Sequence, residues 1–294
     1  MREHIQAIEL GATLFVPASH PNLQSILSGE KYPQLRSMVI DFEDGLAAEE
    51  RQESLKRVTK LLETLTPRKL LRFIRPLDPE MLQTLLQLKG IEKIDGFIFP
   101  KFSLENAKDY LSIIQDQSSQ RINFMPSIEG SELFDIQKLY TLRELLTPHQ
   151  EQLICIRFGA QDMLKQLRLK QSGSLYDMLV PSQVIANIIS TFKPYGFEIS
   201  APVYPNFSNT DGFKKELTYE LLNGLTSKTI IHPNQIQALN DLYQVTSKEL
   251  DEATELLKRQ DGVLNLNGVM GERQTQASWA NEIKKRAKIY GIST

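Results

Sequence analysis

Charged side chains recur at the ends of short apolar runs, and their types are those that bind cations and move protons. In chain order these side chains are Asp41, Glu43 and Asp44, then Arg75, then Lys101, then Glu129 and Asp162. If each run is a strand of one parallel barrel, the charged groups meet at the carboxyl ends of the strands, where barrel enzymes carry their active sites. The pattern therefore predicts an acidic catalytic centre.

Glu129 and Asp162 are the most informative pair of carboxylates. They end consecutive predicted strands, and neighbouring strands lie about 4.8 Å apart, so the two groups repel unless one takes a proton or a cation neutralises both. An all-oxygen site with few protein ligands suits Mg²⁺, which keeps several waters and accepts substrate oxygens. Each residue could instead cap the helix that follows its strand. The spacing leaves both interpretations open.

The segment VIDFED (39–44) places Asp41 and Glu43 on one side of a predicted strand and Phe42 on the other. Two carboxylates that point into a barrel require a cation or hydrogen-bond donors, and Arg75 on the next strand is a candidate partner. This network either stiffens the barrel or positions the arginine for a substrate carboxylate. His232, before Pro233, is expected to be a hydrogen-bonded structural residue rather than a base.

The elements that must position these residues alternate regularly. Short β-branched or aromatic runs predict strands at 12–19, 37–44, 69–76, 95–102, 122–130, 153–162, 198–207 and 227–233. Amphipathic stretches lie between them, and Asp78-Pro79 is typical of a helix start. Eight such units in series predict a parallel α/β fold, the (β/α)₈ TIM barrel, with an open doubly wound sheet as the alternative. No Gly-x-Gly-x-x-Gly follows the first strand, which argues against a dinucleotide-binding fold.

The alternation stops after residue 244. We therefore expect residues 1–244 to form the catalytic barrel domain and residues 245–294 to form a C-terminal helical extension. This extension contains the apolar run GVLNLNGVM (262–270) and a final helix with Trp279. About 50 residues bury too little surface to fold comfortably alone. The extension is therefore predicted to serve oligomerisation or to cover the active site.

The composition narrows the class of protein. The 294 residues are 41% hydrophobic and 24% charged, with a formal net charge of −2, and the one small basic cluster (284–288) is expected to be a solvated helix face. No nucleic-acid partner is predicted, because duplex binding needs a concentrated positive surface. No apolar run reaches the roughly 18 residues that span a bilayer, and no membrane partner is predicted. The single cysteine, Cys155, is expected to be a buried strand residue rather than a nucleophile. One cysteine allows no intrachain disulfide, which favours a cytoplasmic location.

Seven segments in order resemble one known family. They are LFVPAS, VIDFEDGLAAEER, FIRPLDP, FPK, PSIEG, FGAQDM and IHPNQI. Together they resemble the citrate lyase β-subunit-like family of the aldolase/citrate lyase superfamily, from about residue 12 to residue 290. The resemblance implies a TIM barrel that binds Mg²⁺, or alternatively Mn²⁺, through Glu129 and Asp162.

The resemblance also assigns roles around that metal pair. It implies that Arg75 binds the substrate's carboxylate or carbonyl, with Arg72 as the alternative because the local motif differs from the usual Arg-Val-Asn. The family's second-strand acids map to Glu43 and Asp44, which we predict to be catalytic. Further substrate contacts are predicted at the following residues: Lys101, Gly159 and Ala160.

One departure from the family pattern lies near the C-terminus. Family members that act on acyl thioesters often supply the Asp of a Met-x-Asp motif to a neighbouring subunit's site. Here the motif is Met270-Gly271-Glu272, whose carboxylate is one methylene longer. The resemblance thus implies a catalytic Glu272 and a homo-oligomer, either a trimer or a hexamer.

These features predict a Mg²⁺-dependent carbon–carbon lyase. Its substrate would be a hydroxy-carboxylic acid or the corresponding acyl thioester, including a CoA thioester, cleaved in a retro-Claisen or retro-aldol reaction. One alternative is an acyl-CoA thioesterase that uses the same metal site. Another is a non-catalytic ligand-binding barrel. The two closely spaced carboxylates, Glu129 and Asp162, argue against it, because a protein without catalytic activity has no need for this pair.

Overall fold

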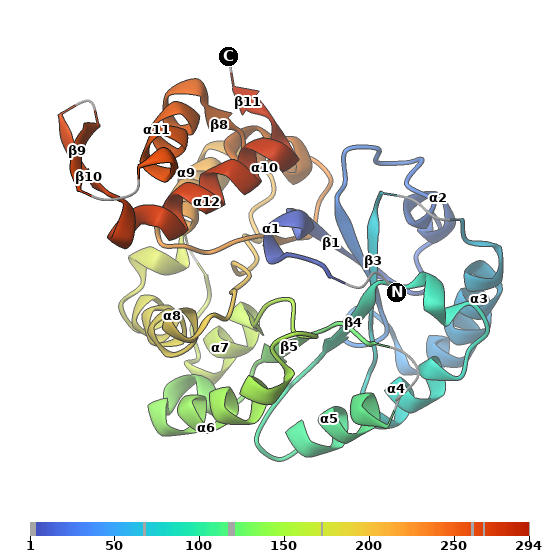
Figure 1. Ribbon diagram of the computed structural model, residues 1–294. Coiled ribbons are helices and arrows are strands. Elements are labelled where there is room, and N and C mark those ends of the chain that lie inside the picture. Colours follow the sequence, from blue (N-terminus) through green and yellow to red (C-terminus); the bar gives the residue numbers. More distant parts are fainter. Residues whose placement is uncertain are drawn as a thin grey trace. The chain divides into compact units, whose positions relative to one another are not determined.

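Runs of β-branched and aromatic residues form a seven-stranded parallel sheet in the computed structural model of this chain (Figure 1). The strands are β1 (Ala12–Pro17), β2 (Ser37–Asp41), β3 (Leu71–Arg75), β4 (Gly96–Phe99), β5 (Phe124–Ile128), β6 (Arg157–Phe158) and β7 (Lys228–Ile230). Their spatial order is β6-β5-β4-β3-β2-β1-β7. Every residue of β2 and of β5 is buried, as expected for strands covered on both faces.

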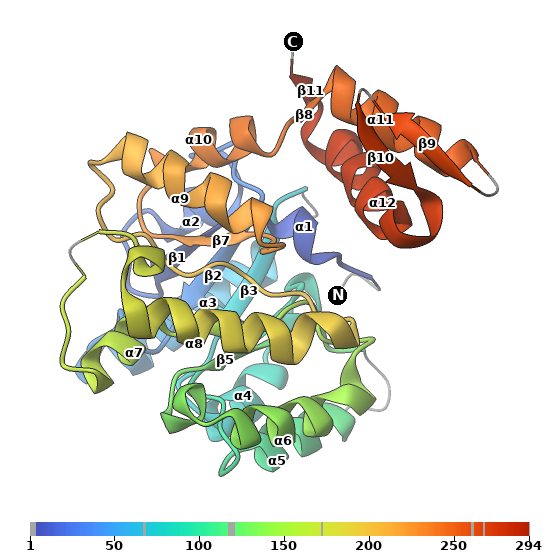
Figure 2. The ribbon, with the colours of Figure 1, turned by 90° about the vertical axis from the view of Figure 1, so that its left-hand side faces the viewer.

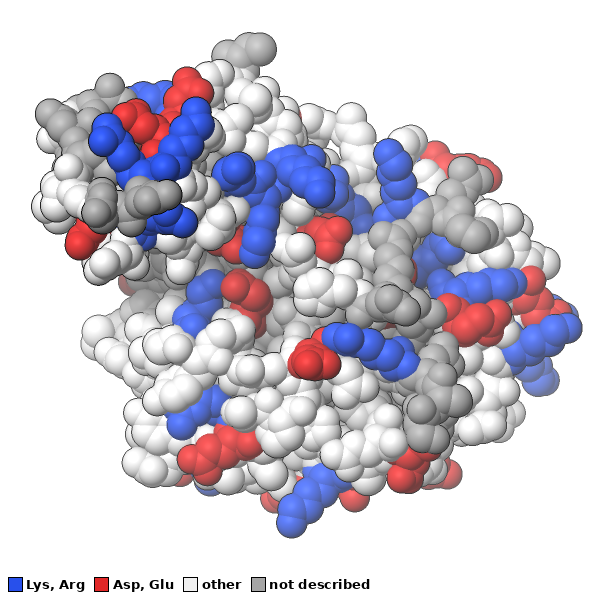
Figure 3. Space-filling model, in the orientation of Figure 1, with Lys and Arg blue, Asp and Glu red and all other residues white. Residues whose placement is uncertain are grey.

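The structure describes residues 4–66, 69–116, 121–171, 173–259, 262–266 and 268–293. The chain divides into two compact units, Met1–Ile236 and Gln237–Thr294. Within the described ranges, no helix is both long and apolar enough to cross a membrane. Figure 3 shows acidic and basic side chains interspersed over one face of the first unit.

An eighth segment, residues 199–201, closes the sheet into a barrel. Ile199 pairs with Ile156 beside β6, and Ala201 pairs with Lys228 in β7, both in parallel. The predicted strand at 198–207 is shorter than expected because Pro202 and Pro205 have no N–H with which to continue a ladder. The predicted barrel is confirmed, and the open-sheet alternative is wrong.

Helices cover the outside of the strands, and Figure 1 shows α3, α4 and α5 in this position. The helices of this unit are α1 (Ala7–Leu10), α2 (Leu23–Leu27), α3 (Arg51–Thr64), α4 (Pro79–Leu86), α5 (Ala107–Gln115), α6 (Ile136–Leu146), α7 (Ala160–Gln166), α8 (Leu179–Phe192) and α9 (Thr210–Leu222), with α10 (Gln235–Leu242) at its end. Single 3-10 turns lie at η1 (Ala48–Glu50), η2 (Ile91–Lys93), η3 (Ser131–Phe134), η4 (Thr147–His149), η5 (Leu175–Asp177) and η6 (Lys193–Tyr195). The predicted start of α4 is confirmed, since the Asp78 carboxylate accepts a hydrogen bond from the Met81 amide at 2.8 Å.

The core of the barrel lies between the strands and the N-terminal helix. Apolar residues of α1 pack with inward-facing strand residues in one buried cluster that includes Leu10, Val39, Phe73, Met125 and Cys155. The predicted burial of Cys155 is confirmed. This packed layer forms a floor below the carboxyl ends of the strands, and polar residues of the candidate site stand above it.

The strand predicted at 153–162 breaks earlier than expected. β6 ends at Phe158, and α7 begins at Ala160 after the N-cap residue Gly159. Asp162 therefore lies in the first turn of a helix rather than at the end of a strand. The physical reason is local, because the segment AQDMLKQ consists mainly of good helix formers.

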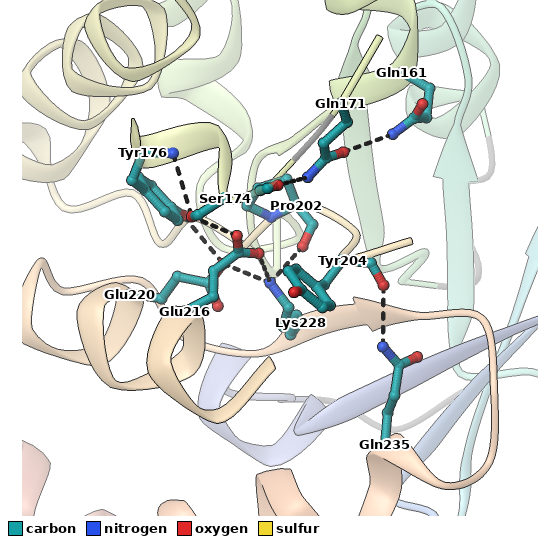
Figure 4. A network of polar contacts seen from close by, with 11 residues as sticks. Gln161, Gln171, Ser174, Tyr176, Pro202, Tyr204, Glu216, Glu220, Lys228 and Gln235 are labelled. Carbon is teal, nitrogen blue, oxygen red and sulfur yellow. Dashed lines mark hydrogen bonds and ion pairs between the residues drawn. The ribbon is translucent and has the colours of Figure 1, made fainter. Parts of the chain in front are cut away.

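The segment between α7 and α8 is anchored by a buried ion cluster on β7, which we call the Lys228 cluster (Figure 4). Lys228 is fully buried and pairs with Glu216 and Glu220 of α9, which runs alongside β7 in Figure 2. From the connecting segment, Ser174 donates to Glu216 at 2.6 Å and Tyr176 donates to Glu220 at 3.1 Å. The cluster thus ties this segment to the side of the barrel.

The second unit has a small core of its own. Its elements are β8 (Val245–Thr246), α11 (Ser247–Lys258), β9 (Val263–Leu266), β10 (Val269–Glu272), α12 (Arg273–Tyr290) and β11 (Ile292–Ser293). Helices α11 and α12 pack through Ala253, Leu256, Ala280 and Ile283. The expected helical extension therefore also holds strands, because the apolar run 262–270 forms the antiparallel pair β9–β10. Asn267 of that run lies outside the described residues.

Arg286 departs from the expected solvated face of α12. Its side chain is buried, and its guanidinium donates to the carbonyl oxygens of Tyr243 at 3.4 Å and Gln244 at 3.2 Å. These carbonyls satisfy the charged group, while Lys284, Lys285 and Lys288 are exposed as expected. The basic cluster is therefore partly structural.

Candidate active site

A cavity of about 340 Å³ opens at the carboxyl ends of the barrel strands. Residues from β1, β2, β3, β5, β6 and β7 line it, together with the loops that follow them. The lining includes most of the predicted site residues: Asp44, Arg75, Glu129, Gly159, Ala160 and Asp162. The fold thus brings residues that are far apart in sequence into one cavity.

The side chains of Glu129 and Asp162 both lie next to the backbone of Gly159. A β-carbon added to Gly159 would lie 2.6 Å from Cγ of Glu129 and 3.0 Å from Oδ2 of Asp162. Only glycine leaves both carboxylates room at this position. Neither one is the N-cap residue of a helix, since Gly159 precedes α7 and Gly130 precedes η3. Asp162 lies in the first turn of α7, where a carboxylate interacts favourably with the helix dipole, so the capping alternative stays open for Asp162.

The Glu129 carboxylate has the electrostatic character of a cation ligand. Its side chain is buried, and Oε2 has no hydrogen-bond partner. Burial raises the pKa of Glu129 to about 7, and the charges of Glu43 and Asp162 act in the same direction, while a Ser127 hydrogen bond and Arg75 oppose them. A divalent cation would satisfy the unpartnered oxygen and remove the repulsion.

The donor set of this pair fits Mg²⁺. In the part of the chain that the structure describes, no group of three or more His, Cys, Asp or Glu side chains is placed to hold a metal. A cation bound by Glu129 and Asp162 would therefore complete its shell with water or substrate oxygens, which is the usual arrangement for Mg²⁺.

Gln166 holds the two halves of this pair together. Its Nε2 donates to the carbonyl of Glu129 at 2.8 Å and to the carbonyl of Asp162 at 3.2 Å. The amide thus joins the end of β5 to the first turn of α7. Gln166 was not among the predicted site residues, although its position four residues after Asp162 places it on the same helix face.

Arg75 lies at the centre of an ion network at the ends of β2 and β3. Its Nε and Nη2 each lie 2.7 Å from an oxygen of Asp41, and its Nη1 lies 2.8 Å from Oε2 of Glu43. Burial acts to lower the pKa of Arg75, but hydrogen bonding to Asp41 and nearby carboxylates raise it overall. Arg72 lies elsewhere and donates to the carbonyls of Leu27 and Thr66. Of the two predicted arginines, only Arg75 lines the cavity.

Lys101 extends the network from β4. Its Nζ lies 2.7 Å from Oε1 of Glu43 and 3.7 Å from Oδ1 of Asp44. The hydrogen bond with Glu43 raises the pKa of Lys101, whereas burial raises the pKa of Glu43. Lys101 adopts a φ of +46°, a conformation that side chains other than glycine rarely adopt and that concentrates at functional sites.

Arg157, the first residue of β6, was also not among the predicted site residues. This arginine is buried, lines the cavity and donates to the hydroxyl of Thr229 at 2.7 Å. Phe15 lies near both of the cavity's arginines, with its ring centroid 5.4 Å from Cζ of Arg157 and 5.1 Å from Cζ of Arg75. The sequence does contain a signal for this residue, because Arg157 is a charged residue inside the apolar run LICIRFGA.

A chain of side-chain amides supports the α7 wall of the cavity (Figure 4). Gln161 lines the cavity and donates to Oε1 of Gln171 at 3.1 Å, and the Gln171 amide donates to the carbonyl of Gly173 at 3.0 Å. Gly173 precedes Ser174 of the Lys228 cluster. The wall is thereby connected to a rigid, buried part of the barrel.

Glu272 belongs to the second unit, where it ends β10 immediately before α12. Its Oε2 accepts a hydrogen bond from the Thr275 hydroxyl at 3.3 Å. Any catalytic role of Glu272 therefore stays a prediction.

A closed parallel barrel with an acidic and arginine-containing cavity at its carboxyl ends has the organisation of a (β/α)₈ enzyme. Within that class, the chain belongs to the family of carbon–carbon bond lyases of the TIM-barrel fold, whose family model matches residues 4–292. The resemblance found in the sequence motifs is thus confirmed.

Named relatives agree with this assignment. The chain is 27% identical over 276 residues to the citrate lyase subunit beta of Haemophilus influenzae, covering 87% of this chain and 90% of that protein. It is 26% identical over 267 residues to the mitochondrial citramalyl-CoA lyase of Mus musculus, covering 84% and 75%. A solved structure of CitE from Mycobacterium tuberculosis shares the fold with a TM-score of 0.69 at 16% identity, covering 96% of this chain and 99% of that one.

Proposed function

We propose that this chain is a Mg²⁺-dependent lyase that cleaves a carbon–carbon bond in a hydroxy-carboxylic acid or its acyl thioester. The observation that carries the proposal is the pair Glu129 and Asp162 on either side of Gly159, with one buried carboxylate oxygen left without a partner. The Mycobacterium tuberculosis structure, which is a complex with magnesium, acetoacetate and coenzyme A, supports the choice of metal and of a CoA thioester as substrate. Mn²⁺ is an alternative ion for the same oxygen pair.

The charges of the site suit a divalent cation. Five carboxylates (Asp41, Glu43, Asp44, Glu129 and Asp162) stand with three cationic side chains (Arg75, Lys101 and Arg157) in or beside the cavity. The excess of carboxylates leaves a negative centre that attracts a metal ion. Mg²⁺ at this centre would act as a Lewis acid on a substrate carboxylate and the neighbouring oxygen.

The reaction then requires two proton transfers and the stabilisation of one negative charge. A carboxylate base takes the proton of the substrate's β-hydroxyl, the carbon–carbon bond breaks as that carbon becomes a carbonyl, and the bonding pair passes to the acyl fragment as an enolate. Arg75 is held rigidly by Asp41 and Glu43 and would stabilise the developing negative charge. Return of the proton to the enolate carbon completes the acyl product.

The metal site is tested by removing one ligand at a time. We expect Glu129→Ala and Asp162→Ala each to abolish Mg²⁺ binding in calorimetry while the circular dichroism spectrum remains that of the wild type. Glu151→Ala is the matched control, because that carboxylate is exposed and lies away from the cavity lining. Unchanged Mg²⁺ affinity in both site variants would contradict the proposal.

The reaction class is tested by product analysis. The protein is incubated with Mg²⁺ and a panel of 3-hydroxyacyl-CoA thioesters, and the products are identified by mass spectrometry. A lyase releases a new keto acid together with a shorter acyl-CoA. Free CoA with no keto acid would instead show hydrolysis, and the thioesterase alternative would replace the lyase.

We further propose that the second unit completes the site of a neighbouring copy through Glu272, in a homo-oligomer such as a trimer or hexamer. The support is apolar surface on that unit, since Val263, Met270 and Trp279 are all exposed and need a partner to cover them. Glu272 ends the same strand pair and would transfer protons there. A cytoplasmic location is part of the proposal and rests on the single, buried Cys155.

Mixing two inactive variants tests the shared site. Glu129→Ala lacks the metal ligand but keeps Glu272, and Glu272→Ala has the reverse defect. In a shared site, mixed oligomers regain part of the activity, because some barrels keep Glu129 and receive Glu272 from another copy. A wild-type protein that sediments as a monomer while it turns over substrate would refute the shared site.

A further inference from the structure

The aromatic ring of Phe15 lies beside both arginines of the cavity. Phe15 belongs to β1, lines the cavity and packs against the buried cluster that forms its floor. Cζ of Arg75 lies over the ring at 5.1 Å from its centroid, and Cζ of Arg157 lies over it at 5.4 Å. Both separations are within the roughly 6 Å at which the negative face of a ring attracts a cation. One ring therefore interacts with two guanidinium groups.

The two arginines reach this ring from strands that are not neighbours of β1. Arg75 ends β3 and Arg157 begins β6, whereas β1 pairs with β2 and β7. The side chain of Arg157 extends to the hydroxyl of Thr229 on β7, past residues 199–201, which pair with strand segments on both sides. Its guanidinium thus ends beside β1. The two positive charges converge on one point of the barrel interior.

Arg157 has only neutral hydrogen-bonding partners within the described ranges. They are the Thr229 hydroxyl at 2.7 Å, the Met125 sulfur at 3.6 Å and the Cys155 thiol. Burial raises the pKa of Cys155 to about 11, so this thiol is neutral at pH 7. Burial lowers the pKa of Arg157 and the charge of Arg75 acts in the same direction, but an arginine stays protonated at neutral pH. The ring of Phe15 is therefore the contact that offsets the repulsion between the two arginines.

Arg75 is held much more firmly than Arg157. Both oxygens of Asp41 accept hydrogen bonds from its guanidinium, and Glu43 lies at a third nitrogen. If the ring were absent, Arg75 would keep its position, and Arg157 would be the side chain that moves away from the like charge. The position of Arg157 thus depends on the aromatic face.

We propose that Phe15 is a positioning residue whose ring holds Arg75 and Arg157 together as a pair facing the cavity. In the proposed reaction this pair concentrates positive charge where the enolate forms, and charge that is already in place stabilises a transition state without reorganisation. Phe15 acts only through the arginines and touches no reacting atom. The catalytic part of the inference rests on the proposed function, whereas the pairing of the arginines does not.

Fluorinated phenylalanines at position 15 separate attraction of the cations from simple packing. One, two or three ring fluorines withdraw electrons from the face of the ring step by step, while the side chain keeps nearly the same size and its apolar contacts. The same series at Phe73 is the matched control. Phe73 is buried in the floor cluster, and none of the cation–ring contacts among the described residues involves it.

Steady-state kinetics of the full-length protein with Mg²⁺ give the first measurement, with the thioester that product analysis identifies as substrate. We expect kcat to fall roughly two- to threefold with each fluorine at Phe15, and so about 10- to 30-fold in the trifluoro variant, which is the range of a partly desolvated cation–ring contact. KM should stay within about twofold, because the paired charges act on an enolate that forms only in the transition state. The Phe73 series should leave both values unchanged.

Arginine side-chain NMR gives a second measurement that needs no turnover. In protein labelled with ¹⁵N-arginine, the Nε–H signals of Arg75 and Arg157 are assigned by their absence from Arg75→Lys and Arg157→Lys. In Phe15→Leu and in the trifluoro variant, the Arg157 signal should shift and exchange faster with water. The Arg75 signal should keep its slow exchange, because its Nε donates to Asp41 at 2.7 Å.

The outcomes separate this inference from the proposed function. A kcat that stays constant across the Phe15 series, or that falls equally in the Phe73 series, overturns the role of Phe15 and leaves the lyase reaction in place. An Arg157 signal that neither shifts nor exchanges faster in the Phe15 variants also overturns it. If the wild type turns over no substrate, the proposed function fails, and the Arg157 signal alone decides whether Phe15 holds the pair. Should Phe15→Leu not fold, the trifluoro variant supplies both measurements.

Discussion

Replacing Glu129 with glutamine should stabilise the metal-free protein, although it destroys the proposed metal site. The wild-type carboxylate is buried, lies near Asp162 and has one oxygen without a partner. Glutamine has nearly the same shape and no charge. Its carbonyl can still accept the hydrogen bond that Ser127 gives to the wild-type side chain.

The size of the effect follows from the pKa. Burial raises the pKa of Glu129 from 4.5 to about 7, and at 1.36 kcal/mol per pKa unit this corresponds to about 3 kcal/mol of folding free energy. Because the folded state binds this proton more tightly than the unfolded state does, the penalty is absent below about pH 4.5. It grows between pH 4.5 and 7 and is complete above pH 7. The glutamine variant has no such penalty at any pH, because its side chain does not ionise.

Urea unfolding in EDTA at pH 5 and at pH 8 measures the difference. We expect the free energy of unfolding of Glu129→Gln to exceed that of the wild type by about 1 kcal/mol or less at pH 5 and by about 3 kcal/mol at pH 8. Mg²⁺ at about 100 times its Kd should stabilise the wild type by about 2.7 kcal/mol and leave the variant unchanged. The exposed carboxylate of Glu151 provides the control, since Glu151→Gln should change neither value.

Two results would refute this reasoning. If Glu129→Gln is no more stable than the wild type at pH 8, the buried carboxylate carries no electrostatic penalty. If the variant gains as much stability at pH 5 as at pH 8, the gain comes from packing rather than from ionisation. Either result would remove the electrostatic argument for a cation at this position.

The remaining predictions concern three other positions. Gly159→Ala should weaken Mg²⁺ binding at least about tenfold in calorimetry, because its methyl group would displace the Glu129 side chain, whereas Gly173→Ala, with open space around it, should have no effect. Arg75→Lys should lower kcat/KM about 100-fold or more, since lysine cannot hold two carboxylates as a planar fork does, and a fully active variant would exclude that role. Lys228→Met should lower the free energy of unfolding by about 3–5 kcal/mol in urea, because it leaves two buried glutamates without their cation. An unchanged urea midpoint would show that the Lys228 cluster adds no stability.

The alternation of apolar runs and amphipathic stretches predicted a parallel α/β fold and favoured the barrel over an open sheet. Period-two and period-3.6 patterns are local properties, so strands such as β2 and β5 and the capped start of α4 at Asp78 are found nearly where the sequence places them. The same pattern places charged residues after the strands, and parallel topology alone brings such residues to one end of a barrel. Arg75 accordingly shares a cavity with three of the predicted acids, which are Asp44, Glu129 and Asp162.

Other features depended on contacts between distant segments. The approach of Glu129 to Asp162 brings the end of β5 to the first turn of α7, and there the two carboxylates occupy the space that a side chain at Gly159 would need. The bridges at residues 199–201 that close the barrel need neighbours from both β6 and β7. No periodicity in the sequence encodes such pairings, because each is set by where another part of the chain comes to lie.

The sequence by itself determined the fold class, the family and the edge of the barrel at which the charged residues gather. Only the tertiary structure decided which charges neutralise one another. Arg75 and Arg157 are both arginines on barrel strands, yet one is surrounded by Asp41 and Glu43 while the other faces the cavity with neutral partners. The physical reason is that ion pairing depends on separations of a few ångströms across neighbouring strands. Sequence patterns specify the face on which a side chain lies, but not the partner that it meets there.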